Sequence, residues 1–335
     1  MDKIDIKKLA KKQTKSRVTA YAIIVGTILI IYTLSMAYIV GWGFMNTFKT
    51  PTQFGAQPAA LPDLSLFQQY GVPGPEKGVR YYDIFANYKV MFASLSYEQE
   101  ISYITGIFNQ KEVYNYINVS GFEAFLTFLW NSALTMFAGT FLPLYLCCIM
   151  GYLTVNYKYK FSGFIYALVL FTMIIPIIGS GSSMLNLQQS LGIYDNMIGF
   201  FIWNCQFTSM YFLIMFSFFQ GLSTTYFEAA EIDGASQLRM IIAIAIPMAN
   251  TMIWAGIVSL LVTTWNDYMT PLTYLPSYPT LAFGIFRNTR VVKSIKSNEP
   301  AKIAALFVLA LPAVVFFTAF RKKLMGNISI GGIKG

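Results

Sequence analysis

The sequence contains no histidine, and only three of its 335 residues are cysteines. Histidine is the commonest general base and metal ligand of enzymes, so its absence removes the usual acid–base and metal chemistry. Cys147 and Cys148 are adjacent, Cys205 is distant, and all three lie in apolar stretches. This arrangement is neither a disulfide framework nor a zinc-binding spacing. We therefore expect no metal site and no catalytic residue.

Charged residues are also scarce. They make up 12% of the chain, whereas soluble domains carry about 25%, and 56% of the residues are hydrophobic. The mean hydropathy of +0.53 predicts a polytopic membrane protein embedded in the lipid bilayer. Seven of the 24 basic residues lie within residues 1–17, which is typical of a cytoplasmic segment beside a membrane. The net charge of +9 therefore does not indicate a nucleic-acid partner.

Six apolar runs are long enough to cross a bilayer, and none contains an ionisable Asp, Glu, Lys or Arg. They are Val18–Trp42, Ala124–Val155, Phe161–Leu185, Met197–Leu222, Met240–Trp265 and Ile303–Phe320. The first is longer than a signal-peptide core, so we interpret it as a membrane helix, with a cleaved signal as the alternative. Ion-coupled secondary transporters need ionisable groups within their spans, and membrane enzymes need paired acids or histidine motifs. The sequence therefore argues against both classes.

The basic N-terminus predicts that the chain starts in the cytoplasm. Six spans then place both termini and the 223–239 loop in the cytoplasm, and the proline-rich residues 46–120 outside. The cytoplasmic parts hold fourteen basic residues and the outer parts ten, so the charge rule is obeyed only modestly. We predict four segments: a cytoplasmic N-terminus and first helix (1–45), an outer segment with a small folded insert at 93–120 (46–120), a membrane core (121–320) and a cytoplasmic tail (321–335).

A polar island at residues 224–247 separates two apolar runs. Thr225, followed three residues later by Glu228, predicts a capping box and a helix that starts near Tyr226. Asp233-Gly234 predicts a turn, because glycine tolerates the left-handed conformation that closes helices. A second helix is expected to start near Ser236 and to run into apolar sequence. The island therefore predicts a short helix, a turn, and a helix that enters the membrane.

This island resembles the cytoplasmic loop of binding-protein-dependent ABC importer permeases, a MetI-like family. The matching residues are Glu228-Ala229-Ala230, Asp233, Gly234 and Pro247. The resemblance implies an all-α fold with six transmembrane helices, in which this loop docks on ATPase subunits and transmits their motion. The chain has no Gly-x-x-x-x-Gly-Lys-Ser/Thr loop, so it binds no cofactor itself, and ATP-Mg is expected in two partner ATPase subunits.

Other elements resemble the carbohydrate class of this family. They are Asn87-Tyr88, Trp130-Asn131-Ser132, the Leu191–Asn196 connector, Trp265-Asn266-Asp267, and the glycine-rich tail Gly326–Gly335. The tail resembles that of the second permease subunit of the maltose importer, which implies that Gly331 and Lys334 reach toward the ATPases. The further partners implied are a sister permease subunit, as a heterodimer, and an extracellular substrate-binding protein that delivers an oligosaccharide or other carbohydrate. A permease for a non-sugar solute is the alternative.

Polar residues within or beside the spans are candidates for an outer gate or pathway. They are Asn131, Asn204, Asn266 and Asp267, with Gln206 and Asn250 as further amides that are expected to be buried. Polar side chains rarely face lipid, so they line a pathway or hold helices together. For each amide taken singly, we favour the helix-joining role. The sequence does not name the sugar.

Overall fold

The computed structural model describes residues 3–63, 72–73, 80–81, 84–103, 113–157, 160–175, 179–291 and 298–325. Two compact units make up the chain. Unit 1 combines Met1–Val90 with Ser297–Ala304, and unit 2 combines Met91–Lys296 with Ala305–Gly335. Helices α4 (Ala86–Ser94) and α18 (Glu299–Met325) each pass from one unit into the other.

Unit 1 is built on the long helix α1. Its elements are α1 (Lys3–Asn46), α2 (Pro51–Ala56), the paired strands β1 (Val72–Pro73) and β2 (Arg80–Tyr81), and the starts of α4 and α18. The segment Tyr21–Asn46 has a mean hydropathy of 2.3, and none of its apolar window is buried. So much exposed apolar surface requires lipid or a partner around it, which agrees with the predicted first membrane helix.

Side-chain amides fix the end of α1 within unit 1. The buried Asn87 amide nitrogen donates to the carbonyl oxygens of Thr47 at 2.7 Å and Lys49 at 2.8 Å, and Asn298 donates to the Asn87 oxygen at 3.3 Å. The buried Lys49 ammonium donates to two carbonyl oxygens of the following turn. Burial lowers the pKa of Lys49, because it disfavours the charged form. Asn87 of the Asn-Tyr element thus holds the chain that leaves α1.

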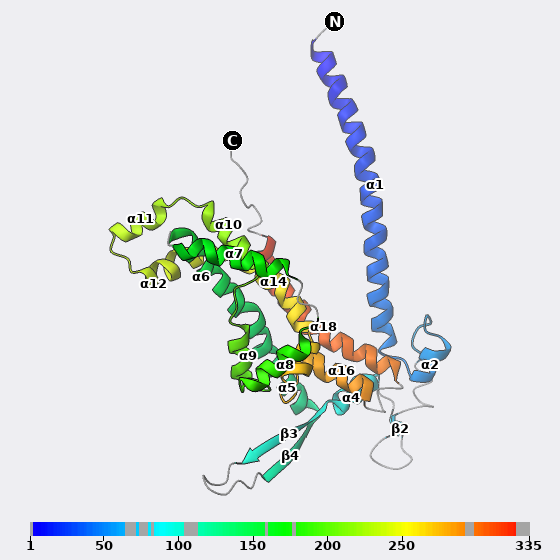
Figure 1. The fold of residues 1–335 in the computed structure, drawn as a ribbon. Coiled ribbons are helices and arrows are strands. Elements are labelled where there is room, and N and C mark those ends of the chain that lie inside the picture. Colours follow the sequence, from blue (N-terminus) through cyan, green and yellow to red (C-terminus); the bar gives the residue numbers. More distant parts are fainter. Residues whose placement is uncertain are drawn as a thin grey trace, which may run out of the picture. The chain divides into compact units, whose positions relative to one another are not determined.

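Unit 2 is a bundle of helices. Its helices are α5 (Phe122–Met136), the π-helical η1 (Phe137–Phe141), α6 (Leu142–Asn156), α7 (Lys160–Ile174), α8 (Gly181–Ser190), α9 (Met197–Asn204), α10 (Met210–Gln220), α11 (Thr225–Ile232), α12 (Gln237–Met240), the π-helical η2 (Ile241–Ala245), α13 (Ile246–Met248), α14 (Asn250–Asn266), α15 (Met269–Tyr274), α16 (Leu281–Val291) and most of α18. Figure 1 shows the loop with α11 and α12 at one end of unit 2 and the strands β3 and β4 at the other.

The core of unit 2 lies between α6, α10 and α14. Buried side chains from these helices, among them Tyr152, Met215 and Ile257, form one apolar cluster. Gly151 of α6 lies directly against α10, since a side-chain carbon at this position would be 3.0 Å from the backbone nitrogen of Phe216. Close backbone approach at a small residue is typical of packing between membrane helices.

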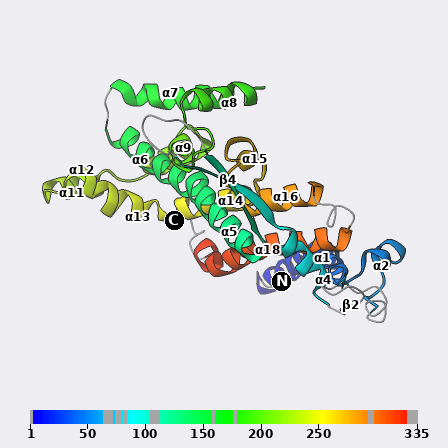
Figure 2. The same cartoon turned by 90° about the horizontal axis from the view of Figure 1, so that it is seen from below.

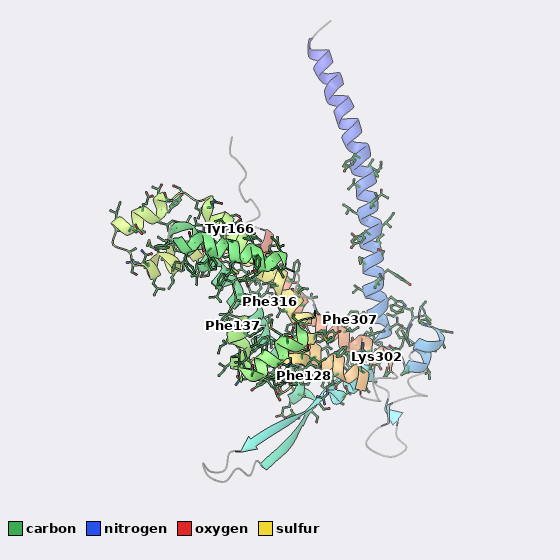
Figure 3. The ribbon with its side chains drawn as sticks, in the orientation of Figure 1. Phe128, Phe137, Tyr166, Lys302, Phe307 and Phe316 are labelled. Carbon is green, nitrogen blue, oxygen red and sulfur yellow. The ribbon has the colours of Figure 1, made fainter. Side chains whose placement is uncertain are left out.

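A second close contact joins α5 to α16. The ring of Phe128 is buried against Gly284, where there is no room for a side-chain carbon. Phe128 is labelled on α5 in Figure 3. This contact brings the start of α16 beside the polar residues one turn further along α5.

The predicted spans are partly interrupted in the structure. Among the described residues, three helices are long and apolar enough to cross a membrane by length and composition: Tyr21–Asn46, Phe122–Asn156 and Glu299–Phe320. A fourth is the pair Gln237–Met248 and Asn250–Asn266, which bends by 68°. The predicted runs 161–185 and 197–222 are each divided into two shorter helices. The helical membrane core is confirmed, and the count of six spans stays a prediction.

The insert predicted at 93–120 is a β-hairpin. Strands β3 (Ser96–Tyr103) and β4 (Val113–Ser120) pair antiparallel, with Ser96 opposite Ser120 at the base. At this base, the backbone N–H of Gly121 donates to the Leu95 carbonyl at 2.9 Å. The all-α prediction therefore omitted this element. Its strands are rich in tyrosine, isoleucine and valine, which favour β-structure.

Candidate functional site

The first candidate site is the 223–239 loop, which contains α11 and α12. The predicted capping box is wrong, because α11 begins at Thr225 with Thr224 as N-cap, and the Thr224 side chain makes no capping hydrogen bond. Thr225 is therefore already within the first turn, and its hydroxyl pairs with the Ser223 hydroxyl at 2.6 Å. The Glu228 carboxylate is exposed in that first turn, where its negative charge interacts favourably with the positive end of the helix dipole.

The predicted turn at Asp233-Gly234 is confirmed. Gly234 has a φ of +74°. Its N–H donates to the carbonyl of Glu231 at 3.0 Å, and the N–H of Ala235 donates to that of Ala230 at 2.9 Å. These two bonds form a Schellman motif, which closes a helix through a left-handed residue. The second helix then begins as expected, with the Ser236 hydroxyl accepting from the N–H of Arg239 at 3.4 Å.

One aromatic side chain attaches this loop to the core. Phe227 is buried, and its ring centroid lies 5.0 Å from that of Tyr152 in α6. The neighbouring large side chains point outward, since Tyr226 is 58%, Ile232 87% and Leu238 66% exposed. Both views place the loop at the margin of unit 2 (Figure 1, Figure 2). The loop therefore presents a free apolar surface on a single anchor.

Three carboxylates lie in the same loop as these apolar side chains. Glu228, Glu231 and Asp233 are all exposed on or beside α11, whereas Ala229 is exposed and Ala230 is half-buried. Small residues leave one side of the helix thin, so a partner can approach its backbone closely. Exposed apolar side chains and carboxylates on one short helix are suited to a protein partner that carries basic groups.

The loop continues into a bent membrane segment. Ser236 starts α12, which runs through the π-helical η2 into α13 and then into α14, with a bend of 68° at the break. The break is at Ala249, and Pro247 lies two residues before it. Proline removes a helical hydrogen bond and is a known cause of kinks, as are π-bulges. The 223–239 loop is thus continuous with α14 through this bend.

The second candidate site, the loop clamp, consists of Asn131, Ser132 and Asp195 around the loop between α15 and α16. The Asn131 amide donates to the Pro279 carbonyl at 3.1 Å, and the N–H of Leu281 donates to the Ser132 hydroxyl at 2.8 Å. The Asp195 carboxylate accepts from the N–H of Ser277 at 2.9 Å and from its hydroxyl at 2.6 Å. Asp195 has a φ of +50°. Three polar side chains thus hold one loop in place.

The remaining predicted pathway residues make local bonds. The Asp267 carboxylate accepts from the N–H of Thr270 at 3.0 Å and so caps α15, whereas Asn204 and Asn266 donate to carbonyls of their own helices. None of these bonds tests a role in the pathway, so that role stays a prediction. Gly331 and Lys334, which were expected to reach the ATPases, lie outside the described residues.

Sequence reasoning missed Asp195 and Phe227 as positioning residues. The Asp195 bonds reach Ser277, 82 positions away, and nothing local in the sequence indicates that contact. Asp195 does lie in the Leu191–Asn196 connector, so the resemblance of this connector to the family was the available signal. Phe227 was not singled out because it is one of 29 phenylalanines in an apolar chain.

We expect Asp195→Ala to lower the free energy of unfolding of the solubilised protein by about 1–2 kcal/mol. Hydrogen bonds to a charged group contribute about 1.5–3 kcal/mol when buried, and this pair is partly exposed. Thermal unfolding in detergent measures the change. Asp195→Asn keeps one acceptor and tolerates a positive φ, so it should cost less than Asp195→Ala. An unchanged unfolding temperature in Asp195→Ala would contradict the proposed role of the carboxylate.

Comparison with known proteins gives the two candidate sites a context. The family model described as "Binding-protein-dependent transport system inner membrane component" matches residues 144–324, more than half of the chain and the whole 223–239 loop. The chain belongs to this family. It is therefore a multi-pass component of a cell membrane and a subunit of a transport system.

Individual relatives share little sequence identity with this chain, but the alignments cover most of both proteins. The chain is 23% identical over 219 residues to the arabinooligosaccharides transport system permease protein AraQ of Bacillus subtilis (strain 168), covering 64% of this chain and 76% of the relative. It is 20% identical to the sulfoquinovosyl glycerol transport system permease protein SmoH of Agrobacterium fabrum (strain C58 / ATCC 33970), covering 73% and 87%.

A solved structure has the same fold. It is a crystal structure of a bacterial ABC transporter involved in the import of the acidic polysaccharide alginate, and one of its chains matches with a TM-score of 0.62. The match covers 92% of this chain and 97% of that chain at 18% sequence identity. The helical permease fold predicted from the 224–247 island is thus confirmed.

Proposed function

We propose that the chain is the permease subunit of an ABC importer for an oligosaccharide or other carbohydrate. The observation that carries this proposal is the exposed 223–239 loop, with its apolar and acidic surface, inside the region that matches the family. The carbohydrate assignment is supported by the relatives, whose names include arabinooligosaccharides, lactose and diacetylchitobiose. A permease for a non-sugar solute is the alternative.

The proposal assigns a face of the membrane to each end of unit 2. The 223–239 loop, both chain termini and the tail would lie in the cytoplasm, where two ATPase subunits bind ATP-Mg. The β3–β4 hairpin, at the other end of unit 2, would then lie outside (Figure 1). A sister permease subunit would complete the membrane pathway as a heterodimer, and an extracellular binding protein would deliver the carbohydrate.

The proposed cycle is alternating access. ATP closes the ATPase pair, which displaces α11. The chain passes that displacement to the membrane helices by two routes: the Phe227 ring, which packs on Tyr152 of α6, and the bent segment from α12 to α14. The helix bundle would open outward in response. ATP hydrolysis would then return the helix bundle to its inward-open state. The energy for the cycle would come from the ATPase subunits and not from this chain.

Uptake by the reconstituted complex tests this function. The chain is co-expressed with its sister subunit and ATPases, placed in proteoliposomes, and supplied with the binding protein and a panel of arabinotriose, lactose and diacetylchitobiose. We expect ATP-dependent uptake of at least one of these sugars and none without the binding protein. Uptake of amino acids or phosphate, with none of any sugar, would favour the non-sugar alternative.

We further propose that the hairpin contacts the binding protein. The test replaces residues 97–118 by a short glycine-rich turn. This change leaves in place the strand pairing of Ser96 with Ser120 and the backbone hydrogen bond from Gly121 to Leu95. We expect the apparent KM for the delivered sugar to rise by about 5- to 30-fold, since a lost interface contact of about 1–2 kcal/mol has that effect. Basal ATPase activity of the complex should stay unchanged. Unaltered stimulation by the binding protein, at the same affinity, would contradict this role.

A further inference from the structure

Residues 281–298, which the proposed topology places outside, carry only positive charge. They contain no Asp or Glu, and their basic residues are Arg287, Arg290, Lys293 and Lys296. Basic residues of membrane proteins concentrate in the cytoplasmic loops. A cluster on the outer side opposes this tendency, so topology does not account for it. Lys293 and Lys296 lie outside the described residues, whereas both arginines belong to α16.

Helix α16 lies towards the end of unit 2 that carries the hairpin, away from α11 and α12 (Figure 1). It packs against α5 and against strand β3. Its first residues, 281–285, are buried, whereas Arg287 and Arg290 are exposed. The start of the helix is therefore fixed in the core, and the two arginines are presented at the end of unit 2 that is proposed to face the outside.

Two aromatic rings support one of these arginines. The rings of Phe286 and Tyr268 are stacked, with centroids 4.1 Å apart and an interplanar angle of 18°. The guanidinium carbon of Arg290 lies 4.7 Å from the centroid of the Phe286 ring. Both rings are half-buried. A guanidinium that already rests on an aromatic ring loses less freedom when it binds an anion.

Arg287 is the neighbour of Arg290 on the helix surface, because residues three apart lie on the same side of a helix. Among the described residues, neither guanidinium forms an ion pair or a hydrogen bond. The next acidic residue along the chain, Glu299, is paired with Lys302 at 2.7 Å. Two unpaired guanidinium groups on one face can bind one oxyanion together, through N–H donors that match its oxygens.

We propose that Arg287 and Arg290 form an outer subsite for the acidic group, a carboxylate or a sulfate, of a charged oligosaccharide. This inference rests on the proposed function and specifies its substrate as an acidic carbohydrate. Tyr268 directly follows Asn266 and Asp267, the candidate outer-gate residues, so the stack adjoins the predicted entrance. The six apolar runs contain no Lys or Arg, so this chain can meet a negative charge with a positive one only outside them.

Uptake of acidic and neutral sugars of equal size tests the subsite. Trigalacturonate is compared with arabinotriose, and a sulfated chondroitin disaccharide with lactose, in the reconstituted complex with its binding protein. We expect uptake of at least one acidic sugar. The double variant Arg287→Gln/Arg290→Gln should raise its KM about 5- to 10-fold, as for the loss of two exposed ion pairs, and leave the KM of a neutral sugar unchanged.

Two further variants serve as controls. Lys302→Gln removes a basic residue of the outer region that already has a partner in Glu299, so it should leave every KM unchanged. It is the sole comparison if the complex takes up acidic sugars alone. Replacement of both arginines by lysine keeps the charge and loses the planar fork, so its KM for the acidic sugar should lie between those of the wild type and the double glutamine variant.

An unchanged KM for the acidic sugar in the double glutamine variant would overturn the subsite. So would exclusion of both acidic sugars by a complex that takes up neutral ones. An equal rise in KM for acidic and neutral sugars would instead assign the arginines to an acidic surface of the binding protein. A rise that occurs in vesicles with phosphatidylglycerol and not in pure phosphatidylcholine would assign them to lipid phosphate.

Each of these results leaves the proposed function intact, because sugar uptake itself persists. Failure of the unmodified complex to take up any sugar, acidic or neutral, would overturn the proposed function together with the subsite. The two failures are therefore distinguishable.

Discussion

Replacement of Gly234 by proline is expected to abolish transport while the chain still inserts in the membrane. Gly234 has a φ of +74°, whereas proline fixes φ near −65° and has no N–H to donate to Glu231. Proline therefore breaks the turn at a cost of about 3 kcal/mol, which corresponds to roughly 100-fold fewer correctly formed loops. Sugar uptake and ATP hydrolysis by the reconstituted complex measure the loss.

Asparagine is the control at the same position. Nothing lies within 4 Å of a side-chain carbon built at Gly234, so only the backbone conformation limits what this position accepts. Asparagine tolerates the left-handed region, whereas this conformation costs about 1–2 kcal/mol for alanine. We expect activity to fall in the order Gly234, Asn, Ala, Pro. If Gly234→Asn is as inactive as Gly234→Pro, the turn is not the cause and the ATPase requires glycine for a direct contact.

The turn was predictable from sequence because its chemistry is local. Gly234 and the Ser236 cap act on residues within five positions, and the structure forms both as expected. The capping box failed for an equally local reason. Ser223 offers a competing hydroxyl two residues before Thr225, and the helix starts one residue earlier than the box requires. Hydroxyl-rich sequence leaves such alternatives open.

The interruptions of the membrane runs were not predictable in the same way. Run 197–222 contains no charged residue, and its break at 205–209 is held by Cys147, sixty positions from Phe207 in the sequence. A small folded insert at 93–120 was predicted but its strands were not, although tyrosine, isoleucine and valine favour β-structure. Composition was sufficient to predict a membrane protein. Whether each apolar run forms one continuous helix depends on contacts with residues far away in the sequence.

Among the candidate pathway residues, the bonds made by each side chain separate two kinds of amide. Asn131 reaches a different element, the loop before α16, which fits the helix-joining role favoured from sequence. Asn204 donates only to its own helix, so its oxygen is not committed to another element by that bond. The two amides differ in whether they contact a segment distant in the sequence. A single sequence does not show which distant segments are in contact.

Phe227→Ala is expected to uncouple ATP hydrolysis from transport. The Phe227 ring is the buried contact between α11 and the core, where it packs on Tyr152. Truncation of a buried phenylalanine costs about 3–5 kcal/mol, so the loop would no longer be held at one position against α6. The ATPases would still bind the exposed surface and hydrolyse ATP, but their motion would not reach the helices. Uptake per ATP hydrolysed should fall by about 10-fold or more, measured by parallel assays on the same proteoliposomes.

Tyr226→Ala separates this role from docking. Tyr226 is adjacent in sequence and 58% exposed, so its loss removes surface from the partner side and leaves the core contact in place. We expect it to weaken association of the ATPases, seen as subunit loss on size-exclusion chromatography, with the uptake per ATP hydrolysed unchanged in the complexes that remain. Phe227→Leu should lie between wild type and Phe227→Ala, because it retains part of the buried volume. If Phe227→Ala instead releases the ATPases and Tyr226→Ala uncouples them, the loop binds its partner through the face assigned here to the core.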